Sequence, residues 1–205
     1  DVFNASEFGP LEKLAYSYHV RPLLVQRTNM KIYCGLTDRN GNPFFDGVCE
    51  KIDSNFFSSF VETYKSMNIG GMMTEWGAMS EDPGSMEQMF DMLNHADDYL
   101  QSWAWWQFKS YEDVTTASVG DVESFYDAKG NLQVDKVKAL SRTYAQVTQG
   151  TPLTIKFDPT NSDFTYTYML DPSIEGPTCI YLNKEWYYPK GYKLTYDAGG
   201  LNMTY

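Results

Sequence analysis

The sequence predicts an α/β protein whose C-terminal part changes to antiparallel β structure. Between residues 14 and 109, short apolar runs alternate with segments whose apolar residues recur every three or four positions. This alternation is typical of parallel strands connected by helices. From residue 151, apolar and polar residues alternate one by one, as in strands buried on one face. We therefore divide the chain into an α/β part, residues 1–150, and a small β domain, residues 151–205.

The composition argues against several classes of partner. A chain of 205 residues with 42% hydrophobic and 16% aromatic residues can build a packed core. Its formal net charge of −11 argues against DNA or RNA, because nucleic-acid affinity depends on neutralising phosphates with Lys and Arg. No run approaches the roughly 18 apolar residues of a transmembrane helix. We expect a globular protein with no nucleic-acid partner and no transmembrane segment.

The first βα unit is expected before residue 80. A strand over residues 14–19 places His19 at its end. Residues 20–53 show little periodicity, and such insertions collect in loops that overhang a site. Residues 54–67 carry an apolar helical stripe that begins at a Ser or Asp cap. The Gly- and Met-rich run over residues 69–78 has no helical period and predicts a buried parallel strand.

An acidic residue, Glu75, lies near the end of this predicted strand. Buried charges occur mainly where they are paired or functional, so Glu75 is the candidate for chemistry. The alternative is a half-exposed strand-end residue that is capped by a neighbour. The position alone does not separate these two interpretations.

The next βα unit is rich in methionine and tryptophan. A helix over residues 86–100 is expected to bury its methionines and to present Asp91, Asp97 and Asp98 to solvent. A strand over residues 102–109 follows, and at least one of its tryptophans should be part of the core because tryptophan supplies a large buried area.

The remaining elements are predicted from loop and turn signals. Residues 110–133 have no clear period, and their acids are expected to be solvated. A helix capped by Asp135 should carry its apolar stripe as far as Val147. Period-two alternation then predicts strands, with apolar side chains at alternate positions of residues 153–157, 164–168 and 192–196.

Several segments together resemble one family. Thr74-Glu75-Trp76-Gly77 resembles the strand-seven nucleophile motif of glycoside hydrolase family 5, the retaining (β/α)8-barrel glycosidases, and more narrowly its endoglycoceramidase branch. Ala15–His19 is similar to the family's strand-six end, and Ser102–Lys109 is similar to its strand eight. Pro177–Leu182 and Tyr188–Tyr192 resemble the closing β domain of endoglycoceramidase-like chains. The resemblance implies the C-terminal portion of a (β/α)8 TIM barrel, about strands six to eight, followed by a small antiparallel β-sandwich domain.

The resemblance implies a role for each site residue. Glu75 would be the catalytic nucleophile, and Trp106 would form the floor under the sugar, with Trp105 in the alternative register. His19 would orient the site, although a histidine at a strand end is also often structural. The family usually has a tyrosine where this chain has Arg21. No metal and no organic cofactor are implied.

One part of the catalytic apparatus is missing from this sequence. Retaining glycosidases need a second carboxyl group as acid/base, about 5–5.5 Å from the nucleophile. In the resembled family this acid follows an asparagine, and the chain contains no Asn-Glu dipeptide. We expect the N-terminal part of the same enzyme to be the partner that supplies it, with a glycolipid or oligosaccharide as substrate. The alternative is an inactive glycan-binding or structural protein on a decayed hydrolase fold.

The cysteines suggest a disulfide, and the sequons, with the net charge of −11, indicate a secreted or lysosomal protein. Cys34 and Cys49 bracket a turn-rich loop that a disulfide would fix, and the alternative is two free buried thiols. Cys179 is either a buried thiol or the partner of a cysteine elsewhere. Asn4 and Asn202 begin N-glycosylation sequons, as expected of a secreted or lysosomal protein.

Overall fold

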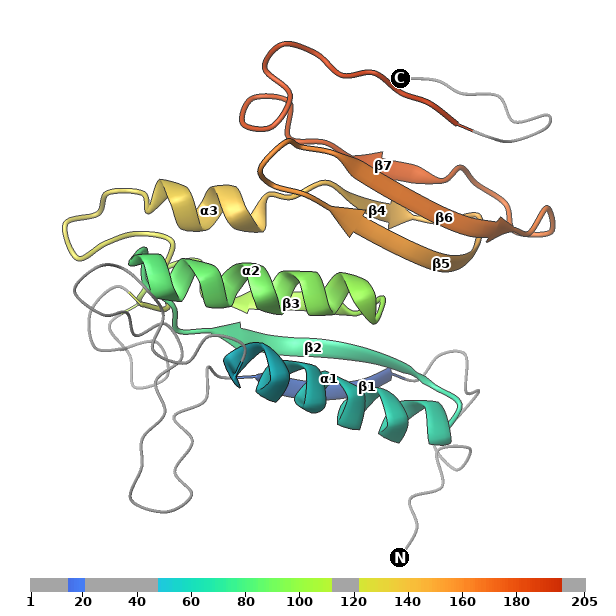
Figure 1. Cartoon of the computed structure of the whole chain (residues 1–205), viewed down its shortest axis with the longest axis horizontal. Helices are drawn as coiled ribbons and strands as arrows, with labels where there is room; N and C mark the ends of the chain where they lie inside the picture. The colour runs from blue at the N-terminus through green and yellow to red at the C-terminus, as the bar shows by residue number, and fades with distance from the viewer. Residues whose placement is uncertain (1–14, 21–47, 112–121, 197–205) are drawn as a thin grey trace, which may run out of the picture.

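The structure is a computed structural model that describes residues 15–20, 48–111 and 122–196 (Figure 1). For some residues in these ranges, including His19 and Cys49, only the backbone is described. The elements are β1 (Ala15–Val20), α1 (Val48–Ser66), β2 (Gly70–Gly77), α2 (Pro83–Asp98), β3 (Ser102–Trp106), α3 (Val134–Leu140), β4 (Tyr144–Val147), β5 (Gly150–Phe157), β6 (Phe164–Leu170) and β7 (Cys179–Tyr181).

The first three strands form one parallel sheet in the order β1-β2-β3. Helices α1 and α2 connect successive strands and pack against each other, as consecutive βα units do. The mixed α/β prediction is therefore confirmed. Helix α1 begins at Val48, six residues before the predicted start, so the expected cap near Ser54 lies inside the helix.

The core lies between this sheet and the two helices. Tyr18 from β1, together with Met73 and Trp76 from β2, packs against apolar side chains of both helices. The helix side chains in this core include Phe57, Met89, Met92, Leu93 and Ala96. The buried methionines confirm that the methionine stripe of α2 is core packing.

A buried hydrogen-bond chain ties α1 to the first and third strands. The Tyr18 hydroxyl donates to Gln101 Oε1 at 2.9 Å, and Gln101 Nε2 donates to the Tyr64 hydroxyl at 2.7 Å. Burial raises the pKa of both tyrosines, so their hydroxyls stay protonated. Gln101 immediately precedes β3, and these bonds fix where that strand begins.

Helix α2 begins with a side-chain cap. Asp82 is the N-cap residue and Pro83 follows it, where the missing N–H of proline costs no hydrogen bond. The Asp82 carboxylate accepts from the Ser85 backbone N–H at 3.1 Å and from the Ser80 hydroxyl. The turn that follows β2 is therefore closed by its own side chains.

The C-terminal part forms two separate two-stranded antiparallel sheets, β4-β7 and β5-β6. Two predictions here are wrong. The helix that was expected to reach Val147 ends at Leu140, because the residues from Tyr144 form β4 and pair with β7. Residues 192–196 form no strand. The sandwich arrangement and the division after residue 150 stay predictions.

The C-terminal part meets α2 through a buried ion pair. In Figure 1 its sheets lie above α2, and β5 contacts that helix. Arg142 Nη2 lies 2.5 Å from Asp97 Oδ2, with 3% and 12% of the two side chains exposed. The prediction that Asp97 is solvated is wrong, because the helix face that carries it is covered.

No helix within the described ranges is long and apolar enough to span a bilayer.

Candidate functional site

The carboxyl ends of the three parallel strands bring the predicted site residues together. His19 of β1 is the register partner of Glu75 on β2. Gly77 on β2 is the register partner of Trp106, the last residue of β3. Because the strands are parallel, all these positions lie at the same edge of the sheet (Figure 1). Of His19 only this backbone position is described.

A bulge in β2 places Glu75 on the face away from the helices. The register of β2 shifts against both neighbouring strands near residues 73–76, while Met73 and Trp76 both remain buried under the helices. Thr74 and Glu75 fill the interval between them, and the Thr74 hydroxyl lies 2.6 Å from that of Ser17 on the opposite, exposed face. Glu75 is half-buried there. Bulges often redirect a side chain beside an active site.

The glycine of the motif allows β3 to approach β2 closely. Gly77 has a φ of 153°, a conformation that side chains rarely adopt. A Cβ built at this position would lie 2.2 Å from the carbonyl oxygen of Trp106. Only glycine therefore permits this spacing between the end of β2 and the end of β3.

The tryptophans of β3 divide between the two faces of the sheet. Trp103 and Trp105 both pack edge-to-face on Trp76 and belong to the margin of the core. This confirms that at least one tryptophan of the strand is part of the core. Strand alternation puts Trp106 on the other face, together with Glu75. The peptide bond that follows Trp106 is cis.

Trp105 contacts residues 123–125, a segment that the sequence analysis did not identify as part of the site. Its indole N–H donates to the carbonyl oxygen of Glu123 at 2.9 Å, and its ring stacks on Phe125 at 6.4 Å between centroids. These contacts leave Trp105 a packing role. The geometry therefore favours Trp106 over Trp105 as the residue that faces a ligand beside Glu75.

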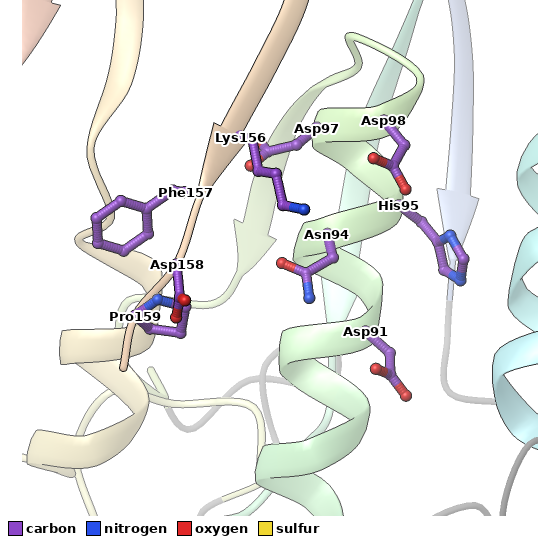
Figure 2. Close-up of a pocket in the computed structure, with 9 residues that line it drawn as sticks. All are labelled: Asp91, Asn94, His95, Asp97, Asp98, Lys156, Phe157, Asp158 and Pro159. Carbon is purple, nitrogen blue, oxygen red and sulfur yellow. The ribbon is translucent and has the colours of Figure 1, made fainter. Parts of the chain in front are cut away.

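A cavity of about 330 Å³ lies elsewhere, between the C-terminal half of α2 and the end of β5 (Figure 2). Four of its nine lining residues are aspartates: the lining comprises Asp91, Asn94, His95, Asp97, Asp98, Lys156, Phe157, Asp158 and Pro159. Because α2 runs antiparallel to the strands, this half of the helix lies at the edge where the strands begin. The cavity is therefore at the opposite edge of the sheet from Glu75.

The other predicted residues are only partly described. Cys34, Asn4 and Asn202 lie outside the described residues, and Cys49 falls on α1 without a described side chain. The disulfide and the glycosylation sites stay predictions. Cys179 is a free, half-buried thiol on β7. Within the described ranges, no group of three His, Cys, Asp or Glu side chains is placed to hold a metal ion.

Comparison with known proteins gives consistent matches. Residues 142–205 match the family model described as the glycoside hydrolase family 5 C-terminal domain. An endoglycoceramidase of Hydra vulgaris is 33% identical over 130 residues, which is 63% of this chain and 24% of that protein. Endoglycoceramidase I of Rhodococcus hoagii (strain 103S) is 26% identical over 172 residues, which is 84% of this chain and 30% of that protein.

Solved structures of endo-glycoceramidase II from Rhodococcus sp. share the fold. The complex with a cellobiose-like isofagomine has a TM-score of 0.61 at 18% identity, over 83% of this chain and 33% of that chain. The structure described as its lactosyl-enzyme intermediate has a TM-score of 0.55 at 18% identity, over 68% of this chain and 29% of that chain. At this identity the likeness shows the fold alone. The chain spans about a quarter to a third of the length of these relatives.

Proposed function

We propose that this chain is part of a retaining β-glycosidase of glycoside hydrolase family 5, in its endoglycoceramidase-like branch, and that the enzyme acts on glycosphingolipids. The family model over residues 142–205 and the similarity to endoglycoceramidases support this proposal. The observation that carries the proposal is the position of Glu75. It lies at the carboxyl edge of a parallel sheet, beside His19 and one strand from Trp106. In barrel enzymes the reacting groups come from this edge.

In the proposed reaction the Glu75 carboxylate attacks the anomeric carbon of the sugar. A glycosyl ester forms as the bond to the lipid oxygen breaks, and the acid/base protonates that leaving oxygen. Water, deprotonated by the same acid/base, then cleaves the ester and releases Glu75. The lactosyl-enzyme intermediate described for endo-glycoceramidase II supports such a two-step course.

The acid/base belongs, in this proposal, to a preceding segment of the same enzyme. The sequence contains no Asn-Glu dipeptide, and the relatives are three to four times as long as the part matched here. That N-terminal part is the proposed partner of this chain, and it completes the barrel around the site. No metal and no organic cofactor take part in this reaction.

Two further side chains complete the proposed site. Trp106 provides a flat aromatic face on which the C–H-rich side of a sugar ring stacks, and its place on the Glu75 face of the sheet supports this role. His19 orients the nucleophile or donates to the substrate, which its register with Glu75 supports. We place the enzyme outside the cell or in the lysosome, on the net charge of −11 and the two sequons.

The second candidate function is an inactive glycan-binding protein on the same fold. One variant pair separates the two. In the natural full-length protein, Glu75→Gln should reduce release of oligosaccharide from a glycosphingolipid to background, whereas Glu87→Gln, an exposed position on α2, should leave it unchanged. Proton NMR of the first-formed sugar should show retained β configuration. Unchanged turnover in Glu75→Gln refutes the assigned nucleophile, and a wild type that binds without cleaving supports the inactive alternative.

A further inference from the structure

A fully buried lysine lies next to Trp105, near the end of β3. Lys136, on helix α3, is 0% exposed, although its apolar neighbour Val134 is 49% exposed. Burying an ammonium group is costly unless its hydrogen bonds are satisfied. The buried ammonium group therefore needs hydrogen-bond acceptors within reach of its Nζ.

The Lys136 ammonium group binds two backbone carbonyls. Its Nζ donates to the carbonyl oxygen of Ser124 at 2.9 Å and to that of Val122 at 3.3 Å. It also lies 5.9 Å from the ring centroid of Trp105, on which a cation is favourably placed. These two carbonyls flank Glu123 in the sequence.

The carbonyl of Glu123 in turn holds both neighbours of Trp106. It accepts from the Trp105 indole N–H at 2.9 Å and from the Gln107 backbone N–H at 2.7 Å. Trp106 is thus fixed on both sides by one oxygen atom. The orientation of that oxygen depends on the carbonyls that Lys136 binds on either side of it.

The same helix is also attached to the turn that follows β2. Glu81 Oε1 accepts from the backbone N–H groups of Asp135 at 2.8 Å and Lys136 at 3.2 Å. Glu81 lies six residues after Glu75 in the sequence. The start of α3 therefore connects the loop after β2 with the loop after β3, the two strands whose ends carry the proposed nucleophile and the proposed sugar platform.

We propose that Lys136 is a positioning residue that sets the orientation of Trp106 relative to Glu75. The inference rests on the proposed function, in which Trp106 stacks on the sugar. Lys136 touches no substrate. It acts through the Val122 and Ser124 carbonyls, which hold the Glu123 carbonyl where it accepts from the Trp105 indole N–H and the Gln107 backbone N–H.

The test replaces Lys136 with methionine in the natural full-length protein. Lys136→Met keeps the length of the side chain but removes the ammonium donor from both carbonyls, leaving the Ser124 carbonyl only its second donor, Gln133 Nε2 at 2.8 Å. The matched control is Arg142→Met, which removes another buried cation, 3% exposed, that binds Asp97 on the far side of α2. Both variants should lose stability, but only Lys136→Met should reduce kcat/KM, by about 10- to 100-fold, since small misplacement of a substrate contact costs this much.

Two readouts separate positioning from general destabilisation, and a second variant is available if the first does not fold. In Lys136→Met, hydrogen exchange at the Gln107 amide should rise, and in Arg142→Met it should not. In a Trp106→Ala background, Lys136→Met should cause no further loss of kcat/KM, because the side chain that it positions is gone. If Lys136→Met does not fold, Trp105→Phe tests the same chain of contacts, since it removes the N–H that binds the Glu123 carbonyl.

Each outcome decides the inference. Equal kcat/KM in Lys136→Met and Arg142→Met, measured where both are folded, would overturn it, as would full additivity with Trp106→Ala. If the wild type proves inactive, the proposed function fails by itself. In that case the Gln107 exchange rate still decides whether Lys136 fixes the backbone around Trp106.

Discussion

Replacing Gly77 with alanine should damage both stability and the site, and the size of the effect follows from one contact. The new Cβ would lie 2.2 Å from the carbonyl oxygen of Trp106 and 3.4 Å from the Trp105 ring. Because backbone cannot rotate away, the end of β3 must retreat by roughly 1 Å, and overpacking of this kind costs about 1–3 kcal/mol. The φ of 153° adds about 1–3 kcal/mol of backbone strain.

We therefore expect Gly77→Ala to lower the free energy of unfolding by about 2–6 kcal/mol in urea titration. The displacement of Trp106 should also lower kcat/KM by up to about 100-fold. Gly70→Ala on the same strand is the control, because nothing lies within 4 Å of its Cβ position. Its stability should stay within about 0.5 kcal/mol of the wild type. Equal stabilities for the two variants would refute the close approach of β2 and β3.

Three further predictions concern the buried polar groups. Arg142→Met should lower the free energy of unfolding by about 3–5 kcal/mol, because it leaves the Asp97 carboxyl buried without its ion-pair partner. Urea titration measures this loss, and a value below about 1 kcal/mol would contradict the prediction. Burial, opposed by the nearby Arg142 charge, raises the pKa of Asp97 to about 6, so the folded chain holds this proton more tightly than the unfolded chain. The free energy of unfolding should therefore fall as the pH rises from about 4 to about 6, by at most about 1.4 kcal/mol per pH unit. Asp97→Asn should flatten that part of the pH profile. Gln101→Leu should cost about 2–4 kcal/mol by thermal unfolding, because the Tyr18 and Tyr64 hydroxyls both lose their hydrogen bond to Gln101. Tyr18→Phe in the same background should recover part of that loss.

The parallel sheet was predictable because its signals are local. The run over residues 69–78 has no helical period and stands between two amphipathic segments, and the structure places β2 at Gly70–Gly77. The strand predicted from residue 102 is β3, and the helical stripe before it is α2. In each case a side-chain pattern within about fifteen residues determines the element.

The C-terminal part was less predictable because distant pairing decides it. Val137, Leu140, Tyr144 and Val147 fit a helical period, yet Tyr144 pairs with Tyr181 on β7. A partner so far along the chain overrides a local pattern. Residues 192–196 also alternate, but they pair with none of the described strands and do not form a strand.

The candidate site divides in the same way. Glu75 could be proposed from the sequence because an acid at the end of an apolar strand is unusual and because Thr74–Gly77 resembles a known nucleophile motif. Lys136 and the Glu123 carbonyl could not, since a lysine in a short helix is ordinarily exposed and a backbone carbonyl leaves no mark on the sequence. The burial of Lys136 beside an exposed Val134 reverses the usual pattern, and only the fold reveals it.

The most direct test of the central claim is to trap the covalent intermediate. A 2-deoxy-2-fluoro glycoside with a good leaving group should react with the natural full-length enzyme and leave its sugar esterified to the nucleophile. Peptide mass spectrometry of the labelled protein then identifies the modified residue. The label should lie on Glu75, in the peptide that contains Thr74-Glu75-Trp76-Gly77, and Glu75→Gln should remain unlabelled. A label on any other carboxylate, or labelling that persists in Glu75→Gln, would contradict the assignment.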